Sequence, residues 1–267
     1  MSRLGVRFHL GLAAAAAGRR HQPVEPGCAQ FRLGVAAEKF RLSWLSPPTV
    51  TLAPMLDLIL PLECGGCGLP STRWCDTCAK ELSVAADQPH VVNPRIDPQV
   101  PVFALGRYAG ARRQAILAVK EHGRGDLVAP LARALAAGVH RLLVWGMVET
   151  PLTIVPAPTR RSAARRRGGD PVTKVAVAAV AAHPEISVVR ALRMRALARD
   201  SVGLGTSARE RNVAGRVLLS GKPGKLLGTE VVVVDDIVTT GATARESVRV
   251  LQSAGTRVAA VLTIAFA

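Results

Sequence analysis

The chain has 267 residues, enough for one domain of ordinary size with smaller additions, and 49% of them are apolar, so it can bury a core. Aromatic residues make up only 3%, which excludes a core built on large rings and favours Val, Leu, Ile and Ala packed in α/β layers. The formal net charge of +16 attracts phosphate-rich partners, either a small polyphosphate or a nucleic-acid backbone.

Residues 1–54 show no sustained helical or strand period, and we predict that they form an N-terminal extension outside any domain. Arg3 and Arg7 before the Ala-rich stretch 10–18 resemble a short signal peptide. The chain has no run of 18 uncharged apolar residues, so no membrane insertion is predicted. Paired cysteines further along are typical of reduced metal ligands, which favours a cytoplasmic location.

Four cysteines then occur in two pairs, Cys64-x-x-Cys67 and Cys75-x-x-Cys78, with seven residues between the pairs. This spacing is typical of two knuckles that hold structural Zn²⁺, and four thiolates leave no open position for a catalytic water. A disulfide or a redox dithiol is the alternative. We expect a small zinc-ribbon-like module with its linker over residues 55–100, in which Trp74 packs on the metal site or stacks on a nucleobase.

Residues 101–267 are predicted to form the main domain, an α/β fold with a parallel sheet. Its expected elements are a strand over 102–108, a helix over 111–120, a helix capped by Asp126 and stopped by Gly138, a strand over 152–155, and a helix over 172–182 with Asp170 as N-cap and Pro171 first.

The last predicted unit is a strand over 231–234, a loop, a helix over 242–253 stopped by Gly255, and a strand over 257–265. Four consecutive valines without polar alternation indicate that the first strand is covered on both faces, as in a parallel sheet.

Two carboxylates and a hydroxyl-rich turn follow the valine strand, at the end of the sheet where ligands of α/β proteins collect. The residues are Asp235, Asp236, Thr239, Thr240, Gly241, Ala242 and Thr243. The N–H groups at the start of the next helix suit a phosphate, Gly241 lets the backbone approach it closely, and the threonines add hydroxyl donors. The two acids can accept bonds from ribose hydroxyls directly or through hydrated Mg²⁺. The segment predicts a cradle for ribose 5-phosphate.

Residues 231–243 resemble the motif by which type I phosphoribosyltransferases bind 5-phosphoribosyl 1-pyrophosphate (PRPP). From Met55 to the end, the chain resembles the ComF family, also called competence or amidophosphoribosyltransferase-like proteins. The matching features, in family order, are the paired cysteines, Lys120-x-x-Gly-Arg124, Val155-Pro156-Ala157-Pro158, Arg167-Gly168, Arg209-x-x-Asn212 and the PRPP motif.

The resemblance implies a type I phosphoribosyltransferase fold, PRPP with Mg²⁺ as ligand, and a pyrophosphate loop after the strand at 152–155. Arg160, Arg161 and Arg167 are the candidates there, in a segment, 159–216, that holds 13 basic and 4 acidic residues, a surplus of 9. The chain departs from the family at Gly169 and Asp170, where an aromatic residue and Asn are usual, and at Ser201, where Gln is common. Asp170 would repel pyrophosphate unless Mg²⁺ lies between them, although helix capping explains it.

Two functions follow from the resemblance. The first is a phosphoribosyltransferase, a pentosyl-transferring glycosyltransferase, with an unidentified acceptor. Purine-salvage enzymes of this fold carry an acid where this chain has Thr239, and threonine cannot transfer the proton, so a purine acceptor is not expected. The second is a PRPP- or nucleotide-binding protein that contacts single-stranded nucleic acid in DNA uptake. The acceptor, the retention of activity and the oligomeric state are left open.

Overall fold

The computed structural model describes residues 62–159, 169–195, 215–221, 224, 226 and 228–267. Residues 1–54, the candidates Arg160, Arg161 and Arg167, and Ser201 lie outside these ranges.

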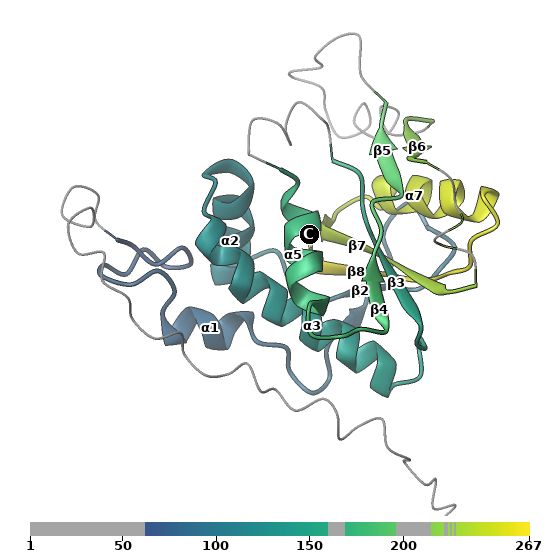
Figure 1. Cartoon of the computed structure of the whole chain (residues 1–267). Helices are drawn as coiled ribbons and strands as arrows, with labels where there is room; N and C mark the ends of the chain where they lie inside the picture. The colour runs from purple at the N-terminus through teal and green to yellow at the C-terminus, as the bar shows by residue number, and fades with distance from the viewer. Residues whose placement is uncertain (1–61, 160–168, 196–214, 222–223, 225, 227) are drawn as a thin grey trace, which may run out of the picture. The chain divides into compact units, whose positions relative to one another are not determined.

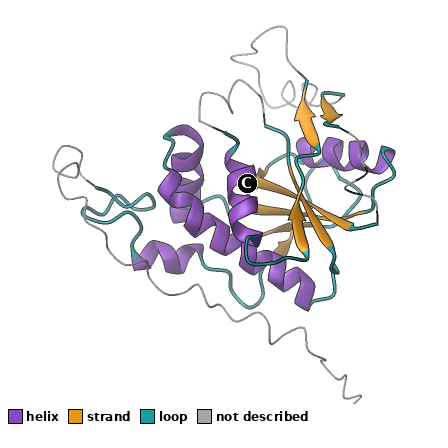
Figure 2. Ribbon diagram, in the orientation of Figure 1, coloured by secondary structure: helices purple, strands orange, loops and turns teal. Residues whose placement is uncertain are grey.

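The described chain forms a six-stranded sheet with the order β1-β2-β8-β7-β3-β4 (Figures 1 and 2). Its strands are β1 His90–Val91, β2 Val102–Ala104, β3 Leu152–Pro156, β4 Ile186–Val188, β7 Glu230–Val238 and β8 Val258–Phe266. The last five of these run parallel to their neighbours, and β1 adds one antiparallel edge. The expected α/β class with a parallel sheet is therefore confirmed.

Helices cover both faces of this sheet. On one face lie α2 Gly110–Glu121, α3 Val128–Val144 and α5 Pro171–Val180; on the other lie α7 Ala242–Ser253 and a ribbon of β5 Leu192–Met194 and β6 Val217–Leu219 (Figure 1). Val232 and Val234 of β7 point into the first core, whereas Val231 and Val233 point into the second, and all four are 0% exposed. The valine run is thus buried on both sides, as predicted.

The predicted caps of α5 and α7 agree with the structure. Asp170 is the N-cap of α5, its carboxylate accepts a bond from the Thr173 N–H at 3.1 Å, and Pro171 is the first helical residue. Helix α7 spans the predicted residues, and Gly255 follows its end with a φ of 78°. These caps depend on neighbouring residues only, which is why the sequence predicts them well.

The predicted bounds of α3 are wrong at both ends. Asp126 does not cap it but lies in a separate 3-10 turn, η1 Gly125–Leu127, where its carboxylate binds Arg124. Gly138 does not stop the helix but lies inside it. A side chain larger than hydrogen would not fit at this position, because a Cβ would lie 2.5 Å from the Leu105 side chain. The glycine is needed for the close approach of helix and sheet rather than for chain reversal.

The strand expected over 102–108 is also shorter than predicted. Strand β2 ends at Ala104, but the chain stays beside β8 as far as Tyr108, whose N–H donates to the Phe266 carbonyl at 2.8 Å. An isolated bridge between Arg107 and Phe266 belongs to this irregular continuation of the pairing.

Among the described helices, one is long and apolar enough to cross a membrane by length and composition, the stretch Gly125–Val144 formed by η1 and α3. Of this stretch 56% is buried inside the domain, and α3 packs against α5 and β8. Such packing is typical of a core helix.

The cysteine module precedes the sheet and ends in helix α1 Asp76–Leu82, whose N-cap is Cys75. The module contacts the domain at two places: the side chain of Leu127, in the α2–α3 connection, fills the space beside Gly65, and the Glu81 carboxylate accepts a bond at 2.8 Å from the N–H of Ala111 in the first turn of α2. The module is therefore joined to the helices by specific contacts.

Candidate functional site

Strand β7 continues to Val238, although the sequence predicts a loop after Val234. Strand β8 pairs with it over the added residues, with Asp235 opposite Thr263. Because the strand is longer, the turn before α7 contains only residues 239–241. The two acids therefore lie within the strand and not in a loop.

A small cavity of about 40 Å³ opens at this turn. It is lined by six of the seven predicted cradle residues: Asp235, Thr239, Thr240, Gly241, Ala242 and Thr243. Helix α7 begins at Ala242 and is 12 residues long, so its first N–H groups and the positive end of its dipole lie at the cavity. We call this site the β7–α7 cradle.

Asp236, the seventh predicted residue, faces the opposite side of the sheet, because successive side chains of a strand alternate. It lies among side chains of α2, α3 and α5 and is 8% exposed. There the Nζ atom of Lys120, on α2, is 2.6 Å from its Oδ2 atom. The structure thus separates the two carboxylates, and it adds Lys120, to which the sequence reasoning assigned no role in the site.

The two carboxylates differ in their surroundings. Burial, and then the charge of Asp236, raise the pKa of Asp235 well above its usual value. Burial opposes the charged form of Lys120, but the neighbouring Asp236 carboxylate more than offsets this and raises the pKa of Lys120. Asp236 therefore has a fixed cation, whereas Asp235 is a carboxyl group that a hydroxyl or a cation in the cradle would satisfy.

Gly241 is required by a contact within the protein. Its φ of 86° lies in the left-handed region, and a Cβ there would be 2.3 Å from the carbonyl oxygen of Ile96. The Ile96 N–H donates to the carbonyl of Thr240 at 2.8 Å, and Arg245 donates to the carbonyl of Asp97 at 2.8 Å. The segment 94–97, expected within the linker, thus packs against the turn, so the glycine's close approach is to Ile96.

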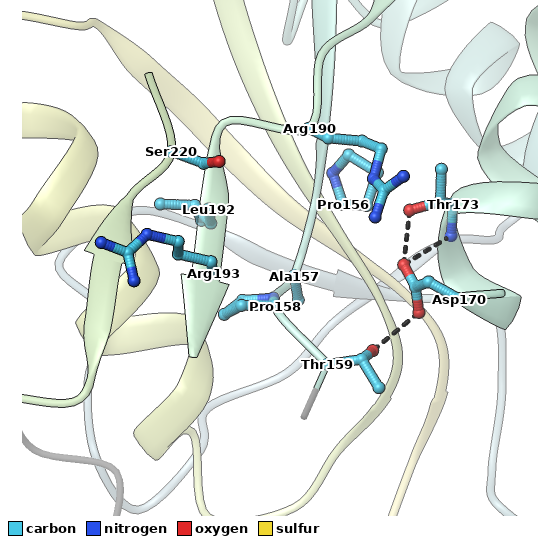
Figure 3. A pocket seen from close by; sticks show the side chains of 10 residues that line it. All are labelled: Pro156, Ala157, Pro158, Thr159, Asp170, Thr173, Arg190, Leu192, Arg193 and Ser220. Atoms are coloured by element: carbon cyan, nitrogen blue, oxygen red, sulfur yellow. Dashed lines mark hydrogen bonds between the residues drawn. The ribbon is translucent and has the colours of Figure 1, made fainter. Parts of the chain in front are cut away.

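A larger cavity, of about 280 Å³, opens where β3 ends (Figure 3). Its lining comes from four separate parts of the chain: Pro156, Ala157, Pro158 and Thr159; Asp170 and Thr173; Arg190, Leu192 and Arg193; and Ser220. Figure 3 shows that Arg190 extends toward Thr173 at the start of α5. We call this site the β3 cavity.

Asp170 lies in the wall of the β3 cavity, and its charge is well satisfied. Its carboxylate accepts a bond from the Thr159 hydroxyl at 2.7 Å and bonds from both the N–H and the hydroxyl of Thr173 (Figure 3). With three donors on the carboxylate, its repulsion of a bound anion is reduced. The capping role expected for Asp170 is confirmed.

Arg190 and Arg193 bring positive charge to the β3 cavity. The sequence analysis counted them in the basic surplus of 159–216 but did not single them out, because Arg190 precedes β5, Arg193 lies within it, and neither belongs to a motif. The arginines it did choose, Arg160, Arg161 and Arg167, lie outside the described residues.

The four predicted cysteine ligands come together. The sulfur atoms of Cys64, Cys67, Cys75 and Cys78 all lie within 4.8 Å of one another, and all four are free of disulfides. A tetrahedral Zn²⁺ with four thiolates needs sulfur atoms about 3.8 Å apart, so the donor set fits such an ion. The structure therefore holds a four-cysteine group that could bind a metal such as zinc.

Electrostatics at this group also favour a cation. Burial alone would raise the pKa of Cys64, but N–H donors from Cys67, Cys75 and Gly66 lower it to about 6. Burial, and then the other sulfur atoms, raise the pKa of Cys78 well above its usual value. The Cys64 thiolate thus forms readily while Cys78 resists ionisation, and a dication would remove that resistance. Trp74 packs beside the group: a Cβ added to Gly66 would lie 3.0 Å from the Trp74 ring.

Comparison with known proteins gives only distant structural matches. No family model matches the chain, and no curated protein matches it. Two solved structures of a hypoxanthine phosphoribosyltransferase from Staphylococcus aureus, in orthorhombic and tetragonal space groups, resemble it with TM-scores of 0.28 and 0.29 at 16% and 18% identity. Each match covers 51% of this chain and 61% of the solved one. The chain is thus similar to these structures over about three fifths of their length, and its chemistry has to be argued from its own residues.

Proposed function

We propose that this protein binds PRPP across the β7–α7 cradle and the β3 cavity and transfers its phosphoribosyl group to an acceptor. One observation carries the proposal: the two polar sites lie at the carboxyl ends of adjacent parallel strands. Pro156 of β3 is opposite Val234 of β7, and the Ala157 N–H donates to the Val234 carbonyl at 2.8 Å. A ligand with phosphate at one end and pyrophosphate at the other can occupy both sites.

The cradle suits the phosphorylated end of the sugar. The helix N-terminus at Ala242 and the hydroxyls of Thr239, Thr240 and Thr243 offer neutral donors to a 5-phosphate. Asp235 lines the same cavity and can accept a bond from a ribose hydroxyl. This division of roles, donors for phosphate and an acceptor for sugar, is the feature that favours a sugar phosphate over a simple anion.

The β3 cavity suits the pyrophosphate. Arg190 and Arg193 supply charge, and Ser220 adds a hydroxyl. When the bond between the sugar and pyrophosphate breaks, negative charge grows on the leaving oxygens, and fixed cations there lower the barrier. We infer that these two arginines act together with Arg160, Arg161 and Arg167.

A bound Mg²⁺ would supply positive charge that neutralises part of the pyrophosphate. Asp235 is the carboxylate of the cradle that could contact such an ion or its water ligands. The chain's own part is to hold the sugar between the two sites, so that an acceptor attacks a fixed carbon atom.

The acceptor is the unassigned part of the reaction. Thr239 lines the cradle where a purine-specific acid would be needed, so we propose an acceptor other than a purine base. Incubation with PRPP, Mg²⁺ and mixtures of metabolites, with detection of released pyrophosphate, identifies it. Pyrophosphate release that requires one metabolite supports transfer, and an absence of PRPP binding by calorimetry contradicts the proposal.

A second candidate function is a non-catalytic protein that binds PRPP or a nucleotide and contacts single-stranded nucleic acid, as the ComF resemblance implies. The basic surplus of nine in residues 159–216 favours it, since one PRPP does not need so many cations. Tight PRPP binding without pyrophosphate release, together with oligonucleotide binding that weakens steeply with salt, would favour this function.

A further inference from the structure

The loop between β1 and β2, residues 92–101, reaches the turn of the β7–α7 cradle. Strands β2, β8 and β7 run parallel, so the first residue of β2 lies toward the edge of the sheet opposite the cradle. The loop returns toward the cradle on the α7 side of the sheet, since Val92 and Val100 near its ends pack on the core that contains α7. Between them, residues 94–97 meet the turn, and we call these four residues the strap.

Three contacts join the strap to the turn and to α7. The Ile96 N–H donates to the carbonyl of Thr240 at 2.8 Å. The carbonyl of Ile96 lies so close to Gly241 that a Cβ there would be 2.3 Å away. From the first turn of α7, the Arg245 guanidinium donates to the carbonyl of Asp97 at 2.8 Å. The strap is therefore fastened to the chain on both sides of the step from turn to helix.

These contacts leave the donors of the cradle available to a ligand. The bonds to the strap use the Thr240 carbonyl and the Arg245 side chain, and neither takes up a backbone N–H of the turn or of α7. Gly241 is the N-cap of α7 and has no side chain for capping, and the Thr240 hydroxyl accepts only a long bond, 3.4 Å, from the Ala242 N–H. A stronger side-chain cap would order the turn but would occupy N–H groups that a phosphate needs. Within the described chain, none of the strap residues lines the cradle, so the strap supports the turn from outside.

We propose that the strap preorganises the β7–α7 cradle for the phosphate end of the ligand, and that Arg245 is a positioning residue that fastens the strap. This inference rests on the proposed function and makes its phosphate site more specific. Without the strap, part of the binding free energy would be lost in ordering the turn. A cation in the first turn of a helix opposes the helix dipole, so the charge of Arg245 does not stabilise α7 itself. Arg245 acts through the strap and does not touch the ligand.

Calorimetry on the full chain tests the two sites separately, with ribose 5-phosphate for the cradle and pyrophosphate with Mg²⁺ for the β3 cavity. Arg245→Met removes the donors and keeps a long side chain. It should bind ribose 5-phosphate about tenfold more weakly and pyrophosphate as wild type does. Arg245→Lys keeps a donor for the Asp97 carbonyl and should restore most of the affinity. In Arg245→Met, amide hydrogen exchange should become about tenfold faster at Ile96, whose N–H the turn accepts, and stay unchanged in β3.

Two further variants separate positioning from general damage. Arg133→Met makes the same chemical change at an exposed arginine of α3 and should alter neither affinity nor exchange at Ile96. Pro94→Gly loosens the strap from its other end, because it removes the ring that packs against Gly241 and adds backbone freedom. It should weaken ribose 5-phosphate about threefold or more. Combined with Arg245→Met, it should add less than its separate effect, since both changes act through one segment.

Different results overturn different statements. If wild type binds neither ribose 5-phosphate nor PRPP, the proposed function is wrong and this inference is wrong with it. If wild type binds but Arg245→Met binds ribose 5-phosphate equally well, only the role of the strap is wrong. Equal loss of both ligands would mean that Arg245 supports the whole domain. Weaker binding with unchanged exchange at Ile96, or effects that add fully to those of Pro94→Gly, would show that Arg245 contacts the ligand itself.

Discussion

The β7–α7 cradle and the β3 cavity are neighbours in space, but they are built in opposite ways. The cradle is lined almost entirely by one stretch of chain, 235–244, with Thr263 of β8 added, whereas the β3 cavity gathers residues from four parts of the chain between Pro156 and Ser220. The shape of a site made from one turn is set by the local backbone geometry. A site made from several elements depends on how the domain packs, so its residues are harder to recognise from the sequence. Each of them can also be substituted separately, with less effect on the rest of the site.

The largest expected effect is that of Gly241→Val in the cradle. A Cβ at this position would lie 2.3 Å from the Ile96 carbonyl, and a φ of 86° strains any β-branched residue, so both ribose 5-phosphate and PRPP should lose all measurable binding. Melting should also occur at a lower temperature, for a loss of about 2 kcal/mol or more. Calorimetry and thermal melting measure the two effects.

Gly255→Val is the matched control for that change. Its φ of 78° is similar, but a Cβ there meets nothing within 4 Å, so it carries the backbone strain without the clash. Stability should fall by about 1 kcal/mol and ligand binding should persist. Equal damage from both glycine changes would mean that the contact with Ile96 has no special importance.

The cysteine module is a second site built from one short stretch of chain. It tests independently whether such a site depends mainly on local geometry. We expect one tightly held Zn²⁺ per chain, and Cys64→Ser combined with Cys75→Ser should remove it and destabilise the chain by several kcal/mol. Metal analysis by mass spectrometry and thermal melting measure these effects. Unchanged zinc content in the double variant contradicts the assignment.

The β3 cavity should respond to Arg190→Ala combined with Arg193→Ala by a selective loss. PRPP with Mg²⁺ should bind about tenfold or more weakly, because charged contacts to pyrophosphate disappear, while ribose 5-phosphate should bind as before. Calorimetry with both ligands makes the comparison. Equal loss for the two ligands would mean that the arginines support the fold of the cradle rather than the pyrophosphate.

A smaller effect is expected for Asp235→Asn, and it depends on pH. The raised pKa of Asp235 means that the folded chain holds this proton more tightly than the unfolded chain, so stability falls as pH rises from the unfolded pKa, about 3.9, toward the folded one. Asn does not titrate, so the variant should melt at a higher temperature than wild type at pH 7, and this advantage should shrink toward pH 4. A difference in melting temperature that does not shrink as the pH falls toward 4 contradicts the stated pKa direction.

The smallest effect is expected from removal of residues 1–54. They lack periodicity and lie outside the ComF resemblance, so a chain that starts at Met55 should melt within about 1 °C of the full chain and bind PRPP equally well. Aggregation of the shortened chain, or a clear drop in melting temperature, would place the domain boundary nearer the N-terminus.

Local chemistry explains why several features were predictable from the sequence alone. The Asp170 cap, the bounds of α7, the buried valines of β7 and the meeting of four cysteines each depend on residues a few positions apart. Caps, alternation and knuckle spacing act over that range, so they appear in the sequence as written.

Tertiary structure decided the rest, because the causes lie far apart in the chain. Gly138 stays inside α3 to make room for Leu105, Gly241 makes room for Ile96, and Asp236 faces Lys120 instead of sharing the cradle with Asp235. Each of these outcomes depends on which segment the sheet brings alongside, and no local pattern records that neighbour. The sequence by itself therefore determined a parallel α/β domain with a threonine-rich turn before its last helix and a four-cysteine module. Packing alone decided that Asp235 and not Asp236 lines the cradle, that Lys120 balances Asp236, and which of the described arginines line the β3 cavity.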